Sequence, residues 1–520
     1  MAGLHEPARY PDLVLAALRR FPGRVAFRQD GRDLTYAQTA DLLARWVTVL
    51  RQRGCRPGDG IGVLSPNRPE VWLGQTAAPF AGGRYTALHP LGSLDDHRYA
   101  CDEAELRFLV VDPIYAERAA ALAERCPSVE TVFTLGPAGV GEDVTALTGA
   151  VAPAPLDGGP HGAEDLAWLI YTGGTTGVPK AAMLPERAVA QMVSSVLSGW
   201  DLPKDKRYLA SAPISHAAGM LITPVLLTGG TVVLHKSFDP ARWLATMAAE
   251  RITLALLVPT MIYAVLDHAD LDRTDLGSLK TIMYGAAAIS PTRLAEGIRR
   301  MGPVFCQLYG QTECAGIGTS LWRAQHLPSD LHRLTSCGMP MPGARVAVLD
   351  DEGRPVADGT PGEISLQGAS VMQGYWKQPE LTASALQGGW LRTGDMAVRD
   401  EAGFLYIVDR KKEMIVSGGF NVFPREIEDV LSTHPAVSAA AVIGVPDDKW
   451  GEAVKALVVA KPGAAVDAAE LIALVRERKG PVYAPKSVEL VDALPLTPVG
   501  KLDKKALRAP YWAGRARQVN

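Results

Sequence analysis

The sequence predicts an α/β fold: a large N-terminal domain of helix-covered β-sheets with a small β-barrel-like region, followed by a smaller α+β domain. The 520 residues exceed the size of one hydrophobic core, so about two to four domains are expected. Short apolar runs alternate with amphipathic helical patterns along most of the chain, which is typical of sheets covered by helices. A compact unit with its own helix and strand patterns follows the charged residues 409–412.

The first elements are two helices and two buried strands. An amphipathic helix is predicted at 13–20, and a longer one at 34–50 with Thr35 as its candidate N-cap. The runs at 60–64 and 108–111 are apolar throughout, as strands buried on both faces are.

The middle of the chain contains a biased loop and a long apolar stretch. Residues 151–162 are rich in Pro, Ala and Gly and predict an exposed loop, and 166–171 predict the strand after it. The apolar stretch 217–234 is interrupted by Pro224. A membrane span needs about 20 uninterrupted apolar residues. We therefore assign this stretch to the core and expect no stable membrane insertion.

The C-terminal elements begin with turn-rich apolar runs at 346–366, which predict the small β region. The last unit is predicted to contain helices at 424–431 and 470–478 and strands at 437–445, 456–460 and 488–490.

Composition excludes several classes of protein. The formal net charge of −3 gives no reason to expect nucleic acid or an anionic membrane as a partner. The six cysteines form no CxxC pair, which argues against a zinc site or a disulfide framework. Because the N-terminus also lacks a secretory pattern, we expect a cytoplasmic protein.

The segment YTGGTTGVPK at 171–180 combines the residue types that hold phosphates. Its glycines permit a tight turn whose backbone N–H groups form an anion nest, its threonines add hydroxyl donors, and Lys180 adds positive charge. It is not a Walker A loop, because Pro179 precedes the lysine and no Ser or Thr follows it. The competing interpretation is a flexible surface turn.

This segment resembles the phosphate loop of the adenylate-forming superfamily, in particular its acyl- and aryl-CoA synthetases. Further motifs follow in the order of that family: YGQTE at 309–313, GEISLQG at 362–368, GYWKQPELT at 374–382, LRTGD at 391–395, DRKKEMIVSGGFNVFPREIE at 409–428 and PLTPVGKLDKKALR at 495–508. The resemblance covers nearly the whole chain.

The resemblance implies two half-reactions. A carboxylic acid attacks the α-phosphorus of ATP with Mg²⁺ present, giving acyl-AMP and pyrophosphate, and coenzyme A then displaces AMP. It implies an AMP- and acyl-binding domain at 1–409, a hinge at 410–412 and a mobile C-terminal lid domain at 413–520, which rotates between the two steps.

Lys501 matches the adenylation lysine of the family, which bridges the incoming carboxylate and the α-phosphate. Two anions meet in this step, so neutralising and positioning them matters more than acid or base catalysis. The competing interpretation is a solvated lysine in a basic run with Lys504, Lys505 and Arg508.

Three further residues complete the expected catalytic set. Glu313 resembles the magnesium ligand, with Thr172 as the ligand from the loop, and Mg²⁺ prefers such hard oxygen atoms. Lys180 supplies charge to the phosphates. Glu313 is alternatively an exposed surface acid.

The nucleotide and coenzyme A sites follow from the same motifs. Tyr309 resembles the residue packed on adenine, Asp395 the ribose ligand and Lys412 the hinge residue, while Asp395 and Arg410 are alternatively a structural ion pair. The expected contacts are Thr172, Gly173, Gly174, Thr175, Thr176, Gly177, Lys180, Gly285, Ala286, Ala287, Tyr309, Gly310, Gln311, Thr312, Asp395, Ile407, Arg410, Lys412, Gly418, Gly419 and Lys501.

The acid site is expected to hold an apolar body, because the segments that resemble its lining are small and apolar. The expected lining is His216, Met220, Ala286, Ala287, Gln307, Leu308, Gly310 and Ile317. His216 is equally well a structural histidine. An amino-acid substrate is disfavoured, because 213–220 contains no carboxylate.

Three functions are therefore compared. The leading one is an acyl- or aryl-CoA ligase. An adenylating enzyme that loads a carrier-protein thiol or stops at acyl-AMP shares every ATP motif. A catalytically inert nucleotide-binding protein is disfavoured by the joint presence of Lys180, Glu313, Asp395, Arg410 and Lys501.

Overall fold

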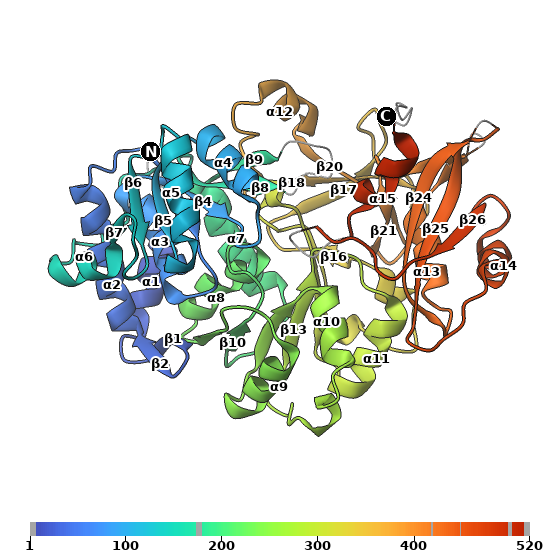
Figure 1. The fold of residues 1–520 in the computed structure, drawn as a ribbon, viewed down its shortest axis with the longest axis horizontal. Coiled ribbons are helices and arrows are strands. Elements are labelled where there is room, and N and C mark those ends of the chain that lie inside the picture. The colour runs from blue at the N-terminus through green and yellow to red at the C-terminus, as the bar shows by residue number, and fades with distance from the viewer. Residues whose placement is uncertain (1–6, 173–178, 418–419, 448, 498–501, 514–520) are drawn as a thin grey trace.

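The computed structural model describes residues 7–172, 179–417, 420–447, 449–497 and 502–513. Four β-sheets and the helices that cover them make up this part of the chain (Figure 1). The predicted α/β fold class is confirmed.

The first sheet has seven strands, and only its last strand runs antiparallel to its neighbour. In spatial order the strands are β7 (Glu142–Asp143), β6 (Thr131–Thr134), β5 (Leu106–Val111), β3 (Gly60–Leu64), β4 (Arg84–Leu88), β8 (Leu166–Thr172) and β9 (Lys180–Pro185).

The second sheet has nine strands and a parallel centre. Its order is β16 (Met339–Pro340), β15 (Thr319–Leu321), β14 (Phe305–Tyr309), β13 (Thr281–Gly285), β12 (Leu254–Leu257), β10 (Arg207–Ala210), β11 (Thr231–Leu234), β1 (Val25–Gln29) and β2 (Arg32–Thr35).

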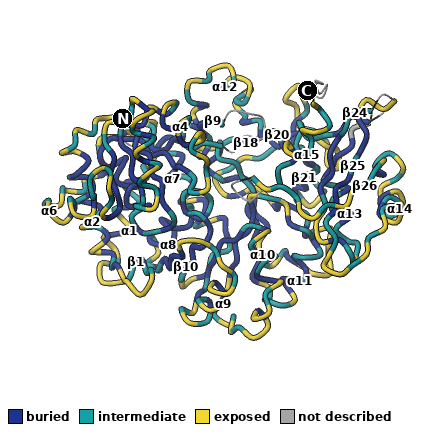
Figure 2. The backbone as a smooth tube through the Cα atoms, viewed as in Figure 1, coloured by how far each residue is buried: buried dark blue, intermediate teal, exposed yellow. Residues whose placement is uncertain are grey.

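One large apolar core joins the facing sides of these two sheets. Most of its helical side chains come from five helices: α1 (Tyr10–Arg20), α2 (Tyr36–Gln52), α3 (Pro69–Ala81), α7 (Glu186–Gly199) and α8 (Ile222–Leu227). Alternation along β12 divides its side chains, since Leu254 and Leu256 enter this core whereas Ala255 and Leu257 enter the core on the opposite face. The most deeply buried backbone follows the sheets (Figure 2).

Other helices cover the outer faces of the two sheets. The first sheet is covered by α4 (Leu94–Glu103) and α5 (Ala116–Arg125), and the second by α9 (Pro240–Ala249), α10 (Pro259–Leu266) and α11 (Pro291–Met301). The remaining short elements are α6 (Val144–Ala150), α12 (Pro379–Ala385), η1 (Pro113–Tyr115), η2 (Ala217–Leu221), η3 (Leu271–Arg273), η4 (Thr312–Cys314), η5 (Arg323–Gln325) and η6 (Arg333–Thr335).

Two five-stranded sheets complete the fold. The predicted small β region is the antiparallel sheet of β17 (Arg345–Leu349), β18 (Gly362–Gln367), β20 (Trp390–Arg399), β19 (Leu386–Gln387) and β21 (Leu405–Arg410). The last sheet contains β23 (Phe420–Val422), β22 (Ile415–Ser417), β25 (Gly451–Ala460), β24 (Val437–Asp447) and β26 (Ser487–Leu490), with α13 (Pro424–Leu431), α14 (Ala468–Lys479) and α15 (Lys504–Trp512).

Local sequence signals explain several element ends. Thr35 caps α2 as predicted, because its side chain accepts the N–H of Gln38 while Gln38 accepts the N–H of Thr35. Leu34 lies in β2, so the helix begins two residues later than predicted. The segment 151–162 contains no helix or strand, but it is not wholly exposed. His161 in it is buried and contacts the buried carboxylate of Glu186 at 3.2 Å.

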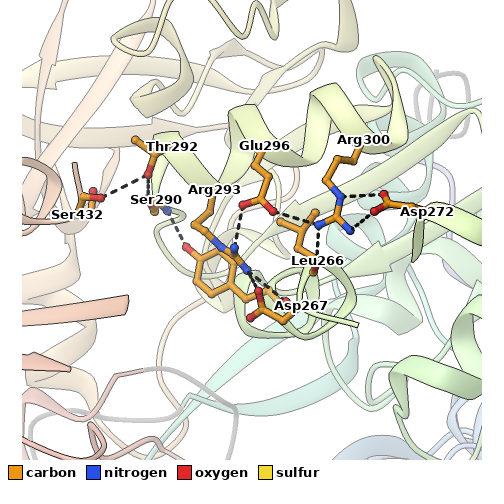
Figure 3. Close-up of polar contacts among 10 residues, drawn as sticks. Leu266, Asp267, Asp272, Ser290, Thr292, Arg293, Glu296, Arg300 and Ser432 are labelled. Atoms are coloured by element: carbon orange, nitrogen blue, oxygen red, sulfur yellow. Dashed lines mark hydrogen bonds and ion pairs between the residues drawn. The ribbon is translucent and has the colours of Figure 1, made fainter. Parts of the chain in front are cut away.

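Polar side chains on α11 join it both to the end of α10 and to Ser432, which follows α13 in the C-terminal part (Figure 3). Arg293 contacts Asp267 at 2.5 Å, and Arg300 contacts Asp272 at 3.0 Å. At the start of the same helix the Thr292 hydroxyl donates to the carbonyl of Ser432 at 3.5 Å. This contact links the large N-terminal sheets to the C-terminal part of the chain.

Candidate active site

The predicted site residues lie where strands of the two large sheets end. Thr172 ends β8, Gly285 ends β13 and Tyr309 ends β14. Ligands of open α/β sheets bind beyond the carboxyl ends of the strands, so this edge is the expected place for a nucleotide.

The ends of the phosphate loop lie side by side. Thr172 pairs with Lys180 in the antiparallel ladder of β8 and β9, so the intervening chain closes a hairpin at the sheet edge. The predicted contacts Gly173, Gly174, Thr175, Thr176 and Gly177 lie outside the described residues.

Tyr375 brings Glu313 and Lys180 together. Its hydroxyl donates to Glu313 Oε1 at 2.8 Å, and Lys180 Nζ lies 5.4 Å from the centre of its ring. Backbone hydrogen bonds from 373–376 to β9 hold the tyrosine against that strand. The helix η4, which contains Thr312 and Glu313, packs against both β8 and β9. The predicted magnesium ligand therefore lies beside the base of the loop.

Asp395 is the centre of a second cluster. Its Oδ2 accepts from the Tyr309 hydroxyl at 2.8 Å and from Gln311 Nε2 at 2.7 Å, and its Oδ1 pairs with Arg410 Nε at 3.0 Å. Asp395 raises the pKa of Arg410, and burial with nearby Asp395 raises that of Tyr309 well above its usual value. Asp395 and Arg410 thus form the ion pair that was considered as an alternative to a ribose site. The pair does not decide between the two interpretations, because these are the same residues that are expected to contact the ribose.

Three cations converge beside these clusters. Burial lowers the pKa of Lys412 to about 8, and repulsion from Arg410 and Lys180 contributes. Like charges held together in a partly buried site favour a bound anion. Ile407, in the strand that ends at Arg410, is half-buried.

The predicted acid site is crowded at its glycines. A Cβ on Gly285 would lie 2.2 Å from the carbonyl oxygen of Leu308, and one on Gly310 would lie 2.3 Å from the backbone of Gly316. Met220 covers Gly316, since a Cβ there would meet its Cε at 2.4 Å. Only glycine therefore fits at positions 285 and 310, where the backbone of another segment lies this close.

The other predicted lining residues differ in burial. Ala286 is exposed with φ of +63°, a conformation that alanine rarely adopts and that is frequent at functional sites, and Ala287 beside it is half-buried. Leu308 and Ile317 are buried in the large apolar core, and Gln307 is buried with no hydrogen-bond partner on Oε1 in the described chain.

Two residues at this edge carry contacts that sequence reasoning missed. The ring of His216 meets the ring of His89 with 4.7 Å between centroids. Tyr375 was quoted only as part of a motif, although its hydroxyl contacts Glu313. Both contacts join residues far apart in the chain. The available signals were the place of His89 after a buried strand and that of Tyr375 in GYWKQPELT.

Lys504 joins α15 to α13 within the C-terminal part of the chain. This lysine is buried and contacts Glu428 at 2.8 Å and Glu413 at 3.7 Å. Burial disfavours its charge, yet Glu428, Asp409 and Glu413 together raise its pKa above the usual value. Lys504, the nearest member of the basic run that was weighed as the alternative for Lys501, is thus buried and paired. Lys501, Gly418 and Gly419 lie outside the described residues.

The described residues contain neither a clustered metal-ligand group nor a helix suited to a bilayer. No three His, Cys, Asp or Glu side chains gather there as a metal-binding group. Of the helices that the structure describes, none combines the length and apolar composition that crossing a bilayer requires. All six cysteines are free thiols.

Comparison with known proteins identifies the family. The model of the AMP-binding enzyme family matches residues 14–376, and the model of its C-terminal domain matches 426–501. A medium/long-chain fatty acid–CoA ligase, FadD8 of Mycobacterium tuberculosis, is 45% identical over 99% of this chain and 92% of its own length. Feruloyl-CoA synthase of an Amycolatopsis species is 39% identical over 95% of this chain and 97% of its own.

Among solved structures, the amide bond synthetase McbA of Marinactinospora thermotolerans is similar over the same extent. It is 35% identical with a TM-score of 0.89, covering 96% of this chain and 99% of that one. The chain therefore belongs to the AMP-binding enzyme family, in the acyl-CoA ligase branch of the adenylate-forming enzymes.

Proposed function

We propose that this protein activates a carboxylic acid with an apolar body, using ATP and Mg²⁺, and transfers the acyl group to coenzyme A. The observation that carries the proposal is the cluster of Tyr309, Asp395 and Arg410, which joins the carboxyl end of β14 to β20 and β21. In the first step a carboxylate oxygen bonds to the α-phosphorus while the bond from that phosphorus to pyrophosphate breaks.

The donor atoms fit Mg²⁺. Thr172 and Glu313 offer hard oxygen atoms beside the phosphate loop, and Tyr375 occupies one carboxylate oxygen of Glu313. Magnesium bound there would offset the charge of the phosphates.

The chain's own groups position the reactants. Asp395 accepts the ribose hydroxyls, and Tyr309 packs on the adenine. Lys180, Arg410 and Lys412 face the phosphates, and Lys501 holds the acid and the α-phosphate together. We also propose the boundaries 1–409, 410–412 and 413–520 for the N-terminal domain, the hinge and the C-terminal lid, with Gly418 and Gly419 lining the path of the thiol.

Relatives support an acid with an apolar body without deciding its shape. One similar protein is named for medium and long fatty acids and another for the aryl acid ferulate, and we propose a substrate within this range. We further propose a cytoplasmic location, because ATP and coenzyme A are available there and the free thiols suit a reducing compartment.

The test is pyrophosphate release with a panel of medium-chain, long-chain, hydroxycinnamic and fused-ring acids, with acyl-CoA detected by mass spectrometry. We expect pyrophosphate only when an acid is present, and one class of acid giving acyl-CoA and AMP when coenzyme A is added. ATP cleavage without acid contradicts the proposal, as does acyl-AMP that persists with coenzyme A.

A second candidate acceptor is an amine, favoured by the similarity to the amide bond synthetase McbA. The same assay with an amine in place of coenzyme A decides between them. Under the leading proposal, acyl-CoA forms at least about ten times faster than the amide, a difference of about 1.4 kcal/mol in the barrier.

A further inference from the structure

His89 lies at the edge of the first sheet where the phosphate loop begins. It directly follows β4, which runs parallel to β8 with Tyr85 level with Trp168. Thr172 lies at the same distance beyond Trp168 as His89 lies beyond Tyr85. The histidine therefore ends its strand beside the base of the loop.

The ring of His89 reaches the connection between β10 of the second sheet and η2. It packs against the ring of His216 with 4.7 Å between centroids and an interplanar angle of 72°. His216 follows β10 and precedes η2, which contains Met220, so it belongs to the predicted acid side of the site. The pair of rings thus joins the phosphate side to the acid side. Such edge-to-face contacts contribute binding energy beyond their buried area.

His216 is fixed on one side by its neighbour. Ser215 Oγ lies 2.9 Å from His216 Nδ1, and the His89 ring contacts the imidazole from another element. A ring held from two sides has few alternative rotamers, so removing one support releases it.

The segment 89–92 holds His89 in a single orientation. The N–H of Leu91 donates to His89 Nδ1 at 3.1 Å, which leaves the proton of a neutral ring on Nε2. The ring of His97, on α4, contacts the carbonyl oxygen of His89 through Nε2 at 2.8 Å. Arg118 donates to the other nitrogen of His97 at 3.3 Å, so Nε2 of His97 is the protonated nitrogen that donates.

Two further contacts make the segment rigid. Arg118 donates to the carbonyl of Gly92 at 2.7 Å, and the Tyr115 hydroxyl donates to the carbonyl of Pro90 at 2.9 Å. A Cβ on Gly92 would lie 2.6 Å from His97 Nε2, so this position requires glycine. Three neighbouring elements, α4, η1 and α5, thus support a loop of four residues.

Both histidines of this support are neutral near pH 7. Burial lowers the pKa of His89, with a contribution from His97, and burial also lowers the pKa of His97. A neutral ring can pack closely beside His216 and an incoming carboxylate without adding a fixed charge.

We propose that His89 is a positioning residue of the acid site, whose ring holds the His216 ring in place and thereby helps to select the acid. The inference rests on the proposed function and adds a residue to it. It assigns the rigid segment 89–92 the task of fixing one wall of the acid pocket.

The test compares His89→Ala with His89→Phe, which keeps a ring against His216. KM and kcat for pyrophosphate release are measured with ATP and with one aliphatic and one aryl acid. We expect His89→Ala to raise the KM for the acid about 2- to 12-fold, the effect of one lost aromatic contact. It should also change the ratio of kcat/KM between the two acids, with the KM for ATP unchanged, and His89→Phe should restore the KM for the acid.

Two controls separate positioning from general damage. His332→Ala removes a similar ring contact, with Tyr406 at 4.5 Å, and should change no kinetic constant. In a His216→Ala background, His89→Ala should add less than a two-fold effect, since the ring it positions is gone. The double variant is therefore compared with the single variant His216→Ala, not with the wild type.

The proposal is overturned if both His89 variants lower kcat equally for all acids while every KM stays constant, or if the effects of His89→Ala and His216→Ala multiply. Unchanged kinetics in His89→Ala overturn it as well. A wild-type protein that releases no pyrophosphate with any acid contradicts the proposed function itself and is recognised before any variant is made.

Discussion

The second sheet makes two contacts of different kinds. Its contact with the first sheet is a continuous apolar core shared mainly with five helices. On its other side the covering helix α11 contacts the C-terminal part through the hydrogen bond of Thr292 to Ser432, and the C-terminal sheet has an apolar core of its own. The small antiparallel sheet adds a polar contact, because Asp409 in β21 accepts from the backbone N–H of Arg425 at 3.2 Å.

We expect the apolar contact between the two large sheets to be permanent and the polar contact with the C-terminal part to be reversible. Breaking the apolar contact exposes large nonpolar surfaces to water, whereas water replaces the partners of a polar contact at small cost. We therefore propose that the two large sheets form a fixed platform for the nucleotide. In this proposal the polar contact permits the C-terminal part to leave and return between the two half-reactions.

The largest expected effect is a loss of stability when the core shared by the two large sheets is altered. Leu254 is fully buried in the shared core, and Leu254→Ala should lower the free energy of unfolding by about 2–5 kcal/mol. Urea denaturation measures it. The matched control Leu490→Ala, at a side chain that is 53% exposed, should change it by no more than about 0.5 kcal/mol. Equal effects of the two substitutions would contradict the assigned core.

The next largest effect is expected on ATP binding, from Asp395, which pairs with Arg410 at the start of the proposed hinge. Asp395→Asn removes the charge that pairs with Arg410 at 3.0 Å and should raise the KM for ATP about 10- to 100-fold. Asp358→Asn removes a similar partner of Arg399 on the same strand, away from the site, and should leave that KM unchanged. A normal KM in Asp395→Asn would remove the aspartate from the ribose site.

A smaller effect is expected at Glu313. Tyr375→Phe deletes only the hydroxyl that donates to its carboxylate, and should raise the Mg²⁺ concentration needed for half-maximal activity about 10-fold. Binding of Mn²⁺ in the presence of ATP, followed by electron paramagnetic resonance without acid, should weaken in parallel. Tyr406→Phe, which loses a hydrogen bond to Asp400 at 3.0 Å, is the control that should behave like the wild type.

The smallest effect is a dependence on pH. Lys412 has a pKa of about 8 without nucleotide, so it is mostly charged at pH 7.5 and mostly neutral at pH 9. A bound polyanion favours the charged form and raises this pKa, so binding takes up a proton and ATP affinity falls as pH rises. Calorimetry should show about 5-fold weaker binding at pH 9.

Two variants identify the titrating group. Lys412→Met should weaken ATP binding at pH 7.5 and remove most of the pH dependence. Lys411→Met should retain the pH dependence, because Lys411 Nζ pairs with Asp351 Oδ1 at 2.6 Å. A retained slope in Lys412→Met would assign the titration to another residue.

The elements that sequence predicted best are those with local signals. The run 60–64 is apolar and matches β3, and Pro424 begins α13 at the predicted residue because its fixed φ suits the first turn of a helix. The strand β9 was not predicted as such. Its KAAMLP sequence lacks alternation, and its pairing with β8 and with the segment around Tyr375 comes from distant residues.

The site shows the same limit. Resemblance of motifs singled out Tyr309, Asp395 and Arg410, and the structure brings these three together. The sequence did not predict the contacts of His89 and Tyr375, because neither residue has a partner nearby in the sequence that would indicate them. Their partners, His216 and Glu313, come from other elements, and only tertiary packing brings them near.

We propose that the C-terminal part returns to the two large sheets and brings Lys501 to the acid and the α-phosphate. Its most direct test is Lys501→Ala in separate assays of the two half-reactions. We expect acid-dependent pyrophosphate release to fall about 10²- to 10³-fold, the usual loss for one group that stabilises charge in a transition state. Transfer from supplied acyl-AMP to coenzyme A should stay within about two-fold of the wild type. Equal losses in both steps, or undiminished pyrophosphate release, would contradict the account.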